Sequence, residues 1–287
     1  MHQKFEKIFS YIIKGLTFSS VMMLIFIIVF IIKESVVLFE KVTIVDFLFG
    51  KGWNPLGEPL TISIFPMILG TIYVSLLGIL IALPIGVGSA IFLTSVLNRK
   101  MRKIVKPTID LLVGIPSVIY GLMGLLVIVK FFEVHFDFSS GESVLAGGII
   151  LSIMVLPYII STCDESMIKI SEQYKITSEG LGVSKWHMIR YLILPACKKS
   201  ILAGVILAFA RAMGETMAVM MVIGNSPVFP KIFGKAQTIP SLIALEMGGA
   251  GVDSLHYHAL FAAGFVLMII LFLVNMVFHY IKKSIEI

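Results

Sequence analysis

Long apolar stretches alternate along this chain with short segments that hold nearly all of its charged residues. A helix that crosses a membrane needs about 20 consecutive, mostly apolar residues. Stretches of that kind predict an all-α protein, a polytopic membrane helix bundle. Six transmembrane helices are expected, at residues 13–35, 67–95, 108–131, 144–163, 199–224 and 259–281.

The first apolar stretch, residues 13–35, is longer than the core of a secretion signal, and no small-x-small cleavage site follows it. We therefore interpret it as a retained membrane anchor. Two parts of the chain are predicted: residues 1–66, with the first helix and an external segment, and residues 67–283, with five core helices. The longest loop of the second part covers about residues 164–199.

Composition supports a membrane location, since 58% of the residues are hydrophobic and only 14% are charged. Soluble proteins are usually about 45–50% apolar and about 25% charged. The net charge of +6 comes from basic residues in the short gaps between apolar stretches, not from a polar basic surface. The expected partner is therefore the lipid bilayer and not a nucleic acid.

The basic residues also predict the orientation, because cytoplasmic loops of membrane proteins carry an excess of Lys and Arg. They concentrate before residue 15, in the gap at residues 99–106, in the loop at residues 164–199 and after residue 281. Both termini are therefore predicted to be cytoplasmic in a multi-pass protein of a bacterial inner membrane.

Small residues predict where the helices pack, since close approach of helices in lipid depends on them. Gly78, Ala82, Gly86 and Ala90 are spaced four apart and form a stripe along the second predicted helix. A similar stripe, Gly204 and Ala208, lies on the fifth.

Features typical of a catalytic or metal site are not found. His256 and His258 are two residues apart and do not share a helix face. Cys163 and Cys197 lack metal-ligand spacing and are expected to stay reduced. Asp110 is interpreted as a carboxylate at the positive start of the third helix. No catalytic residue, metal ligand or cofactor site is therefore predicted in this chain.

Two charges within the fifth predicted helix are the candidates for a translocation path. Arg211 and Glu215 are four residues apart, so they are expected to share a face with the Gly204 stripe and to neutralise each other. Burying such charges costs at least about 2.5–3.5 kcal/mol each, and they normally face a bundle interior or a water-filled path. Arg suits an anion such as phosphate. Thr216 completes the candidate set, and a purely structural pair is the alternative.

The loop at residues 164–199 is the candidate coupling segment. Trp186 and Ile189 are three apart and predict a short helix with a narrow apolar stripe. Its spacing resembles the signature loop of permeases of ATP-driven importers, which runs Glu-Ala-Ala, three residues, Gly, nine residues, Ile, one residue, Leu-Pro. Aligned on Gly182, Ile176 stands at the Glu position. The resemblance implies that the loop docks on an ATPase through these residues: Thr177, Ser178, Glu179, Gly180, Leu181, Gly182, Trp186, Leu194 and Pro195.

Nearly the whole chain resembles phosphate permeases of the PstC type, which are ABC importer permeases of type I. The resemblance is carried by Trp53-Asn54-Pro55, by residues 110–122 and by residues 211–225. It implies a heterodimer with a sister permease, two copies of a cytoplasmic ATPase that binds ATP and Mg²⁺, and an extracytoplasmic phosphate-binding protein. The chain itself is then a transport subunit and not an enzyme.

Several alternatives remain open. The chain could be the sister permease of the PstA type, or a permease for another oxyanion such as molybdate or sulfate. A carrier driven by an ion gradient would usually show internal repeats and broken helices, and no clear repeat is found. An intramembrane enzyme would need a nucleophile beside Arg211 and Glu215, and none is present.

Overall fold

The computed structural model describes residues 2–136 and 140–284, and residues 1, 137–139 and 285–287 lie outside the described part. Its helices and strands, with three π-helical segments marked η, are α1 (His2–Phe39), α2 (Ile44–Phe49), β1 (Trp53–Asn54), β2 (Thr61–Ile62), α3 (Phe65–Ile91), η1 (Phe92–Val96), α4 (Arg99–Leu112), α5 (Ser117–Met123), η2 (Gly124–Val129), α6 (Lys130–Phe136), α7 (Val144–Gly180), α8 (Lys185–Met188), η3 (Ile189–Ile193), α9 (Leu194–Ala196), α10 (Lys198–Met213), α11 (Met217–Met220), α12 (Ile239–Glu246) and α13 (Leu255–Ser284).

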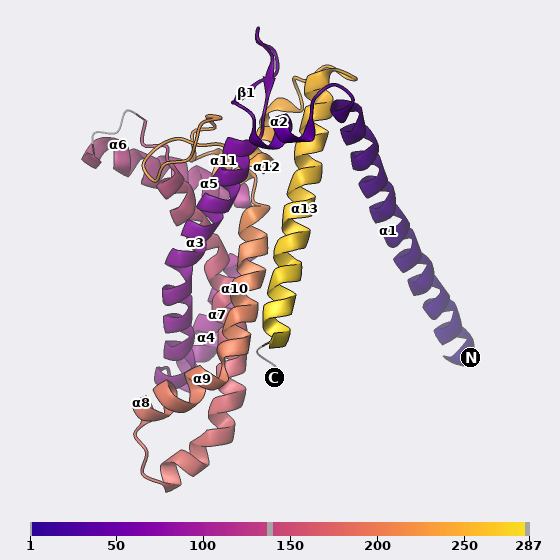
Figure 1. Ribbon diagram of the computed structural model, residues 1–287. Coiled ribbons are helices and arrows are strands. Elements are labelled where there is room, and N and C mark those ends of the chain that lie inside the picture. Colours follow the sequence, from indigo (N-terminus) through magenta and orange to yellow (C-terminus); the bar gives the residue numbers. More distant parts are fainter. Residues whose placement is uncertain (1, 137–139, 285–287) are drawn as a thin grey trace.

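The long helices run roughly side by side, with α3, α7 and α10 at the centre, α13 beside them and α1 leaning away from the rest (Figure 1). The start of α1 and the finish of α13 lie at the same end of the molecule as α8 and α9, which we call the inner end. The β1–β2 hairpin, α2, α11 and α12 lie at the opposite, outer end.

The lengths and hydropathy of the helices fit a membrane protein. Within the described residues, five helical segments are long and apolar enough to cross a membrane. A sixth crossing results if the segments Lys185–Ala196 and Lys198–Met213, bent by 62° at their junction, are counted as one span. On that count, the expected all-α bundle with six crossings is present, and the segment that forms the fifth crossing is bent at its inner end.

The small-residue stripe of α3 packs against another helix, as predicted, and the structure shows that this helix is α7. A Cβ added to Gly78 would lie 2.9 Å from Cβ of Leu151, and one added to Gly86 would lie 2.7 Å from Cγ2 of Ile159. Ala82 and Ala90, in the same stripe, are fully buried. The two helix backbones approach this closely only because the stripe has almost no side-chain volume.

The outer end has its own apolar cluster, which joins the N-terminal segment to α13. Trp53 and Ile62 pair across the two-stranded hairpin and are both buried. They pack with Leu38 of α1, Phe47 of α2 and several residues of α12 and α13. This cluster fixes the outer ends of α1 and α13 relative to each other.

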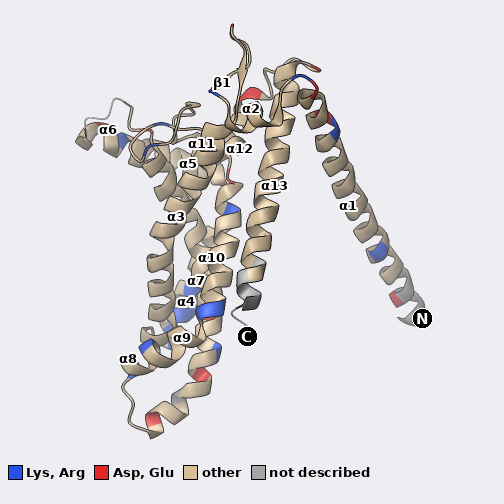
Figure 2. Ribbon diagram, in the orientation of Figure 1, with Lys and Arg blue, Asp and Glu red and all other residues tan. Residues whose placement is uncertain are grey.

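Basic residues gather around α4, α8 and the start of α10, at the inner end (Figure 2). This distribution agrees with the predicted excess of Lys and Arg on one side of the membrane.

The prediction for the third crossing was wrong at its start. Residues 99–112 form a separate helix, α4, without buried residues. The chain then turns at Gly114 and Ile115, and Pro116 precedes the apolar crossing at Ser117–Phe136. Apolar residues before Pro116 concealed this boundary, although a residue before proline disfavours helix.

The prediction for the fourth crossing was too short, because α7 continues from Val144 to Gly180. Charged residues such as Asp164 were taken as its end, but they lie on a helix that runs on beyond the apolar stretch. Much of the predicted loop at residues 164–199 is therefore helical.

Candidate functional site

The candidate coupling segment forms a helix–turn–helix at the inner end. Thr177, Ser178, Glu179 and Gly180 form the last turn of α7, Leu181 and Gly182 lie in the turn, Trp186 lies in α8, and Leu194 and Pro195 lie in α9. The structure thus brings all these predicted residues into one continuous segment.

The turn depends on Gly182, whose φ is +66°. This left-handed conformation favours glycine. After it, the backbone N–H of Val183 donates to the carbonyl of Ser178, and the Ser184 side chain caps α8 by accepting from the N–H of His187. The glycine of the signature therefore reverses the chain between the two helices.

Large apolar side chains are exposed at this turn. Ile176, Leu181 and Trp186 are among the more exposed apolar residues of the inner end. Ile189 is buried instead, so the predicted common stripe of Trp186 and Ile189 was wrong; the buried face of the segment consists of Met188, Ile189 and Ile193. Large apolar side chains that are exposed around one chain turn are typical of a protein-binding surface.

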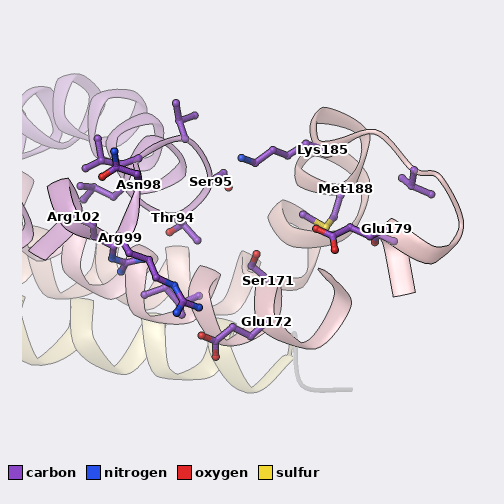
Figure 3. Close-up of a pocket in the computed structure, with 16 residues that line it drawn as sticks. Thr94, Ser95, Asn98, Arg99, Arg102, Ser171, Glu172, Glu179, Lys185 and Met188 are labelled. Carbon is purple, nitrogen blue, oxygen red and sulfur yellow. The ribbon is translucent and has the colours of Figure 1, made fainter. Parts of the chain in front are cut away.

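A cleft of about 550 Å³ lies beside the coupling segment. Figure 3 shows Asn98, Arg99 and Arg102 on one side of it and Lys185 and Met188 on the other. The cleft thus separates the start of α4 from α8, and a movement of either segment would change its width.

A buried ion pair at this cleft escaped the sequence analysis. The side chain of Asp164, on α7, is only 1% exposed and lies 2.6 Å from Nη2 of Arg102, on α4. The hydroxyl of Thr94 donates to the other carboxylate oxygen at 3.0 Å. A charge placed 62 residues from its partner leaves no periodic signal, so only the fold reveals this link.

A second polar cluster joins the same two helices. Asp110 accepts hydrogen bonds from Lys106, at 2.6 Å, and from Ser161 of α7, at 2.8 Å. Burial opposes ionisation, but these two hydrogen bonds hold the pKa of Asp110 below its usual range. The predicted role of Asp110 at a helix start was wrong, because the residue lies in the last turn of α4.

The intramembrane pair lies at a break in the fifth crossing. Helix α10 ends at Met213, and α11 covers only Met217–Met220. The continuous helix predicted at residues 199–224 was therefore wrong. Arg211 and Glu215 nevertheless lie close together, with Nη2 and Oε2 3.6 Å apart, as expected for a pair that offsets its charges.

The break explains the order of the two charges. Arg211 lies in the last turn of α10, where a cation interacts favourably with the negative helix end. Oε1 of Glu215 accepts from the N–H of Ala218 at the start of α11. Within one helix Arg before Glu is the weaker order, but across this break each charge matches its own helix end.

The two side chains differ sharply in exposure. The Glu215 side chain is 4% exposed, whereas that of Arg211 is 48% exposed. Gly204 and Ala208 face the bundle, with Gly204 against Thr162 of α7. The prediction that Arg211 shares this packed face was therefore wrong, and its guanidinium points to a surface that this chain leaves open. The Thr216 hydroxyl donates to the carbonyl of Gly214 within the break.

Two separate segments that carry the family resemblance meet in the fold. A Cβ on Gly121 of α5 would lie 2.8 Å from Sδ of Met221 and 3.0 Å from Cα of Ala218. The Tyr120 hydroxyl donates to the carbonyl of Leu112, across the turn at Pro116. The Tyr-Gly element thus packs closely against α11, the short helix that follows the break after α10.

Comparison with known proteins places these features in context. Residues 82–287 match the family described as the binding-protein-dependent transport system inner membrane component. The probable ABC transporter permease protein YqgH of Bacillus subtilis is 37% identical over 247 residues, covering 86% of this chain and 80% of the relative. The phosphate transport system permease protein PstC of Mesorhizobium japonicum is 35% identical over 261 residues, covering 84% and 79%.

A solved structure has a similar fold. A chain of the MetNI methionine ABC transporter, in an inward-facing conformation, superposes with a TM-score of 0.60 and covers 77% of this chain and 95% of its own length. The sequence identity is 14%, so the similarity concerns the fold.

Proposed function

The chain belongs to the family of binding-protein-dependent transport system inner membrane components, and from this we propose that it is a membrane-spanning permease subunit of an ATP-driven phosphate importer. It is a multi-pass membrane protein with the fold of a type I ABC importer permease. Phosphate as the solute is supported by the names of relatives that are 33–37% identical over most of the chain. Molybdate or sulfate is the competing solute.

The observation that carries the proposal is the exposed apolar turn between α7 and α8, at the end where α1 starts and α13 finishes. Such a surface needs a partner in water. In our proposal the partner is a cytoplasmic ATPase, present in two copies, which binds ATP and Mg²⁺. The inner end is then cytoplasmic, in a bacterial inner membrane.

The open face around Arg211 supports a second partner. A half-exposed guanidinium at the end of a short apolar helix needs either water or another protein. We place the sister permease on this side, so that the anion path runs between the two subunits. The extracytoplasmic phosphate-binding protein would release its bound phosphate at the outer end.

Within this path Arg211 would meet the passing phosphate. Its planar fork can donate two parallel hydrogen bonds to an oxyanion, and Glu215 at 3.6 Å keeps it oriented without occupying all its donors. The hydroxyl of Thr216 lies in the same break. Transport would follow from ATP-driven movement of the coupling segments, which exposes the path to alternate sides.

ATP-dependent phosphate uptake into vesicles that contain the whole importer tests this role. Arg211→Gln should reduce phosphate uptake at least about tenfold, because the charge is lost. Uptake by the Arg211→Lys variant should lie between that of the wild type and that of Arg211→Gln, because Lys keeps the charge but not the planar fork. Lys130→Gln, which removes an exposed cation of α6, is the matched control. Unchanged uptake in both Arg211 variants would refute the path, and uptake of sulfate or molybdate in preference to phosphate would refute the solute.

One observation favours a carrier driven by an ion gradient: helix α10 ends at Met213 and α11 begins only at Met217, and the helices of such carriers are often interrupted in this way. The same uptake assay distinguishes the ATP-driven importer from the gradient-driven carrier. Transport that persists without ATP and stops when the ion gradient collapses would favour the carrier.

A further inference from the structure

Three potential metal ligands meet at the outer end, away from the cleft and from Arg211. Glu34 lies near the finish of α1, Asp253 lies in the turn before α13, and His258 lies in the first turn of α13. Their ligand atoms all lie within 4.8 Å of one another. The sequence analysis expected no metal site, because ligands 219 and 224 residues after Glu34 show no spacing pattern.

The imidazole of His258 has a buried nitrogen that lacks a hydrogen-bond partner within the described residues. Its side chain is 8% exposed, and Nδ1 is buried without a hydrogen bond within the described residues. Nδ1 lies 3.2 Å from Oε2 of Glu34, whose side chain is 13% exposed, but the two do not form a hydrogen bond in this geometry. A buried polar atom normally has a hydrogen-bond partner. Nδ1 of His258 faces the Glu34 carboxylate but has no such partner.

A neighbouring histidine shows what a satisfied pair looks like in the same region. Nε2 of His256 lies 2.7 Å from Oε2 of Glu246, and the indole N–H of Trp53 donates to the same oxygen at 2.9 Å. That carboxylate accepts well-formed hydrogen bonds and needs nothing more. The contrast shows that the Glu34–His258 contact is not simply another histidine–carboxylate hydrogen bond.

The charges also call for a cation. Two carboxylates within 4.8 Å of each other repel, and within the described part of the chain neither Glu34 nor Asp253 forms an ion pair with a Lys or Arg. A bound divalent ion would neutralise both and would give the imidazole nitrogen a partner.

The donor set favours a transition metal over calcium or magnesium. Imidazole suits Zn²⁺, whereas Ca²⁺ and Mg²⁺ prefer oxygen ligands throughout. Zn²⁺ binds His nitrogen and carboxylate oxygen at about 2.0–2.2 Å, which puts tetrahedral ligands roughly 3.4 Å apart. The 3.2 Å between Nδ1 of His258 and Oε2 of Glu34 already matches that separation, and the exposed Asp253 can close the remaining distance by rotating its side chain.

We propose that Glu34, Asp253 and His258 form a site for a divalent transition metal ion, with Zn²⁺ as the best-suited ion, and that the ion joins α1 to α13 at the outer end. Helix α1 leans away from the bundle, and α13 is the helix with which it packs most extensively. An ion at the crossing would hold the angle of α1, while Phe30 and Phe261 supply an apolar contact on the next turns. This proposal does not depend on the transported solute.

Metal binding to the purified full-length chain in detergent tests the site. After treatment with a chelator, titration with Zn²⁺ should show one ion per chain, and Co²⁺ should give the absorption bands of a four-coordinate site. Glu34→Gln, Asp253→Asn and His258→Gln should each weaken Zn²⁺ binding at least about tenfold, since even partners that only support a ligand often matter that much.

His256→Gln and Glu246→Gln are the matched controls and should leave the affinity unchanged. Because Asp253 lies on an exposed turn, the Asp253→Asn variant should fold and can still test the site if the variants of the buried residues fail to fold. Spin labels on α1 and α13 should report a narrower distance distribution after Zn²⁺ is added. Absence of stoichiometric binding, or equal binding by the Asp253→Asn variant, would overturn the proposal.

Discussion

At the scale of single residues, the buried pair of Asp164 and Arg102 stands out because each lies on a different helix. The carboxylate is almost fully buried and is satisfied by Arg102 and Thr94, whereas the arginine remains partly exposed. The pair therefore anchors α4 to α7 beside the coupling segment. A buried charge that loses its partner destabilises a protein more than an exposed one does.

Arg102→Gln is predicted to lower the stability of the chain by about 3 kcal/mol, because the buried Asp164 carboxylate then lacks its counterion. Thermal unfolding of the purified protein in detergent measures the effect. Asp110→Asn is the control, since its half-exposed carboxylate should contribute at most about 1 kcal/mol. Equal shifts for both variants would contradict the assignment of Asp164 as the main anchor.

Arg211 and Glu215 show what the spacing of residues in a sequence can predict about a structure and what it cannot. Two opposite charges four apart in an apolar stretch correctly predicted that the side chains would meet. Their different exposure could not be predicted, because it depends on the helix break at Gly214 and on the neighbours of α10. The functional role of the pair stays a prediction.

At the scale of helices, the contact between α3 and α7 forms the centre of the bundle. It depends on glycines and alanines that bring the backbones together, and a single methyl group at Gly86 would meet Cγ2 of Ile159. Ile is β-branched and has few alternative rotamers in a helix, so the contact cannot relax by a simple side-chain rotation.

Gly86→Ala is predicted to destabilise the bundle by about 1–3 kcal/mol through overpacking. Gly88→Ala is a close control, because it lies two residues away on the same helix and its added methyl would meet nothing within 4 Å. That variant should be neutral or slightly stabilising, since Ala favours helix over Gly by about 1 kcal/mol. Thermal unfolding in detergent separates the two, and a loss of equal size in both would argue against the packing explanation.

The coupling segment shows both the strength and the limit of sequence reasoning at this scale. The spacing of Trp186 and Ile189 predicted a short helix, and α8 contains Trp186. The positive φ of Gly182 explains why a glycine stands in the turn before it. The helical extension of α7 to Gly180 was missed, because charged residues on an exposed helix resemble a loop in a hydropathy pattern.

At the scale of the whole molecule, apolar surface at the inner end is the feature that a partner would cover. Trp186 is 65% exposed and stands beside the turn that carries Leu181. Trp residues are over-represented among the side chains that contribute most to interface affinity.

Trp186→Ala is predicted to weaken binding of the ATPase subunit by about 2 kcal/mol, or roughly thirtyfold, without unfolding the chain. Co-purification and a binding titration with the isolated ATPase measure the effect. Leu126→Ala, which removes an equally exposed apolar side chain from η2, should leave that affinity unchanged. Wild-type affinity in the Trp186 variant would place the docking surface elsewhere.

The sequence by itself determined the membrane class, the number of crossings, the stripe on α3 and the short helix that contains Trp186. Each of these depends on neighbours within one helix or on a short motif, so the signal survives in a linear pattern. The same holds for the family, whose motifs are local.

Only the tertiary structure decided which distant polar groups meet. The Asp164–Arg102 pair, the contact of Gly121 with Ala218 and the Glu34–Asp253–His258 cluster each join separate elements. Such contacts depend on how helices cross and where they break. A linear sequence records the residues that can form these contacts, but the path of the backbone in three dimensions selects the pairs.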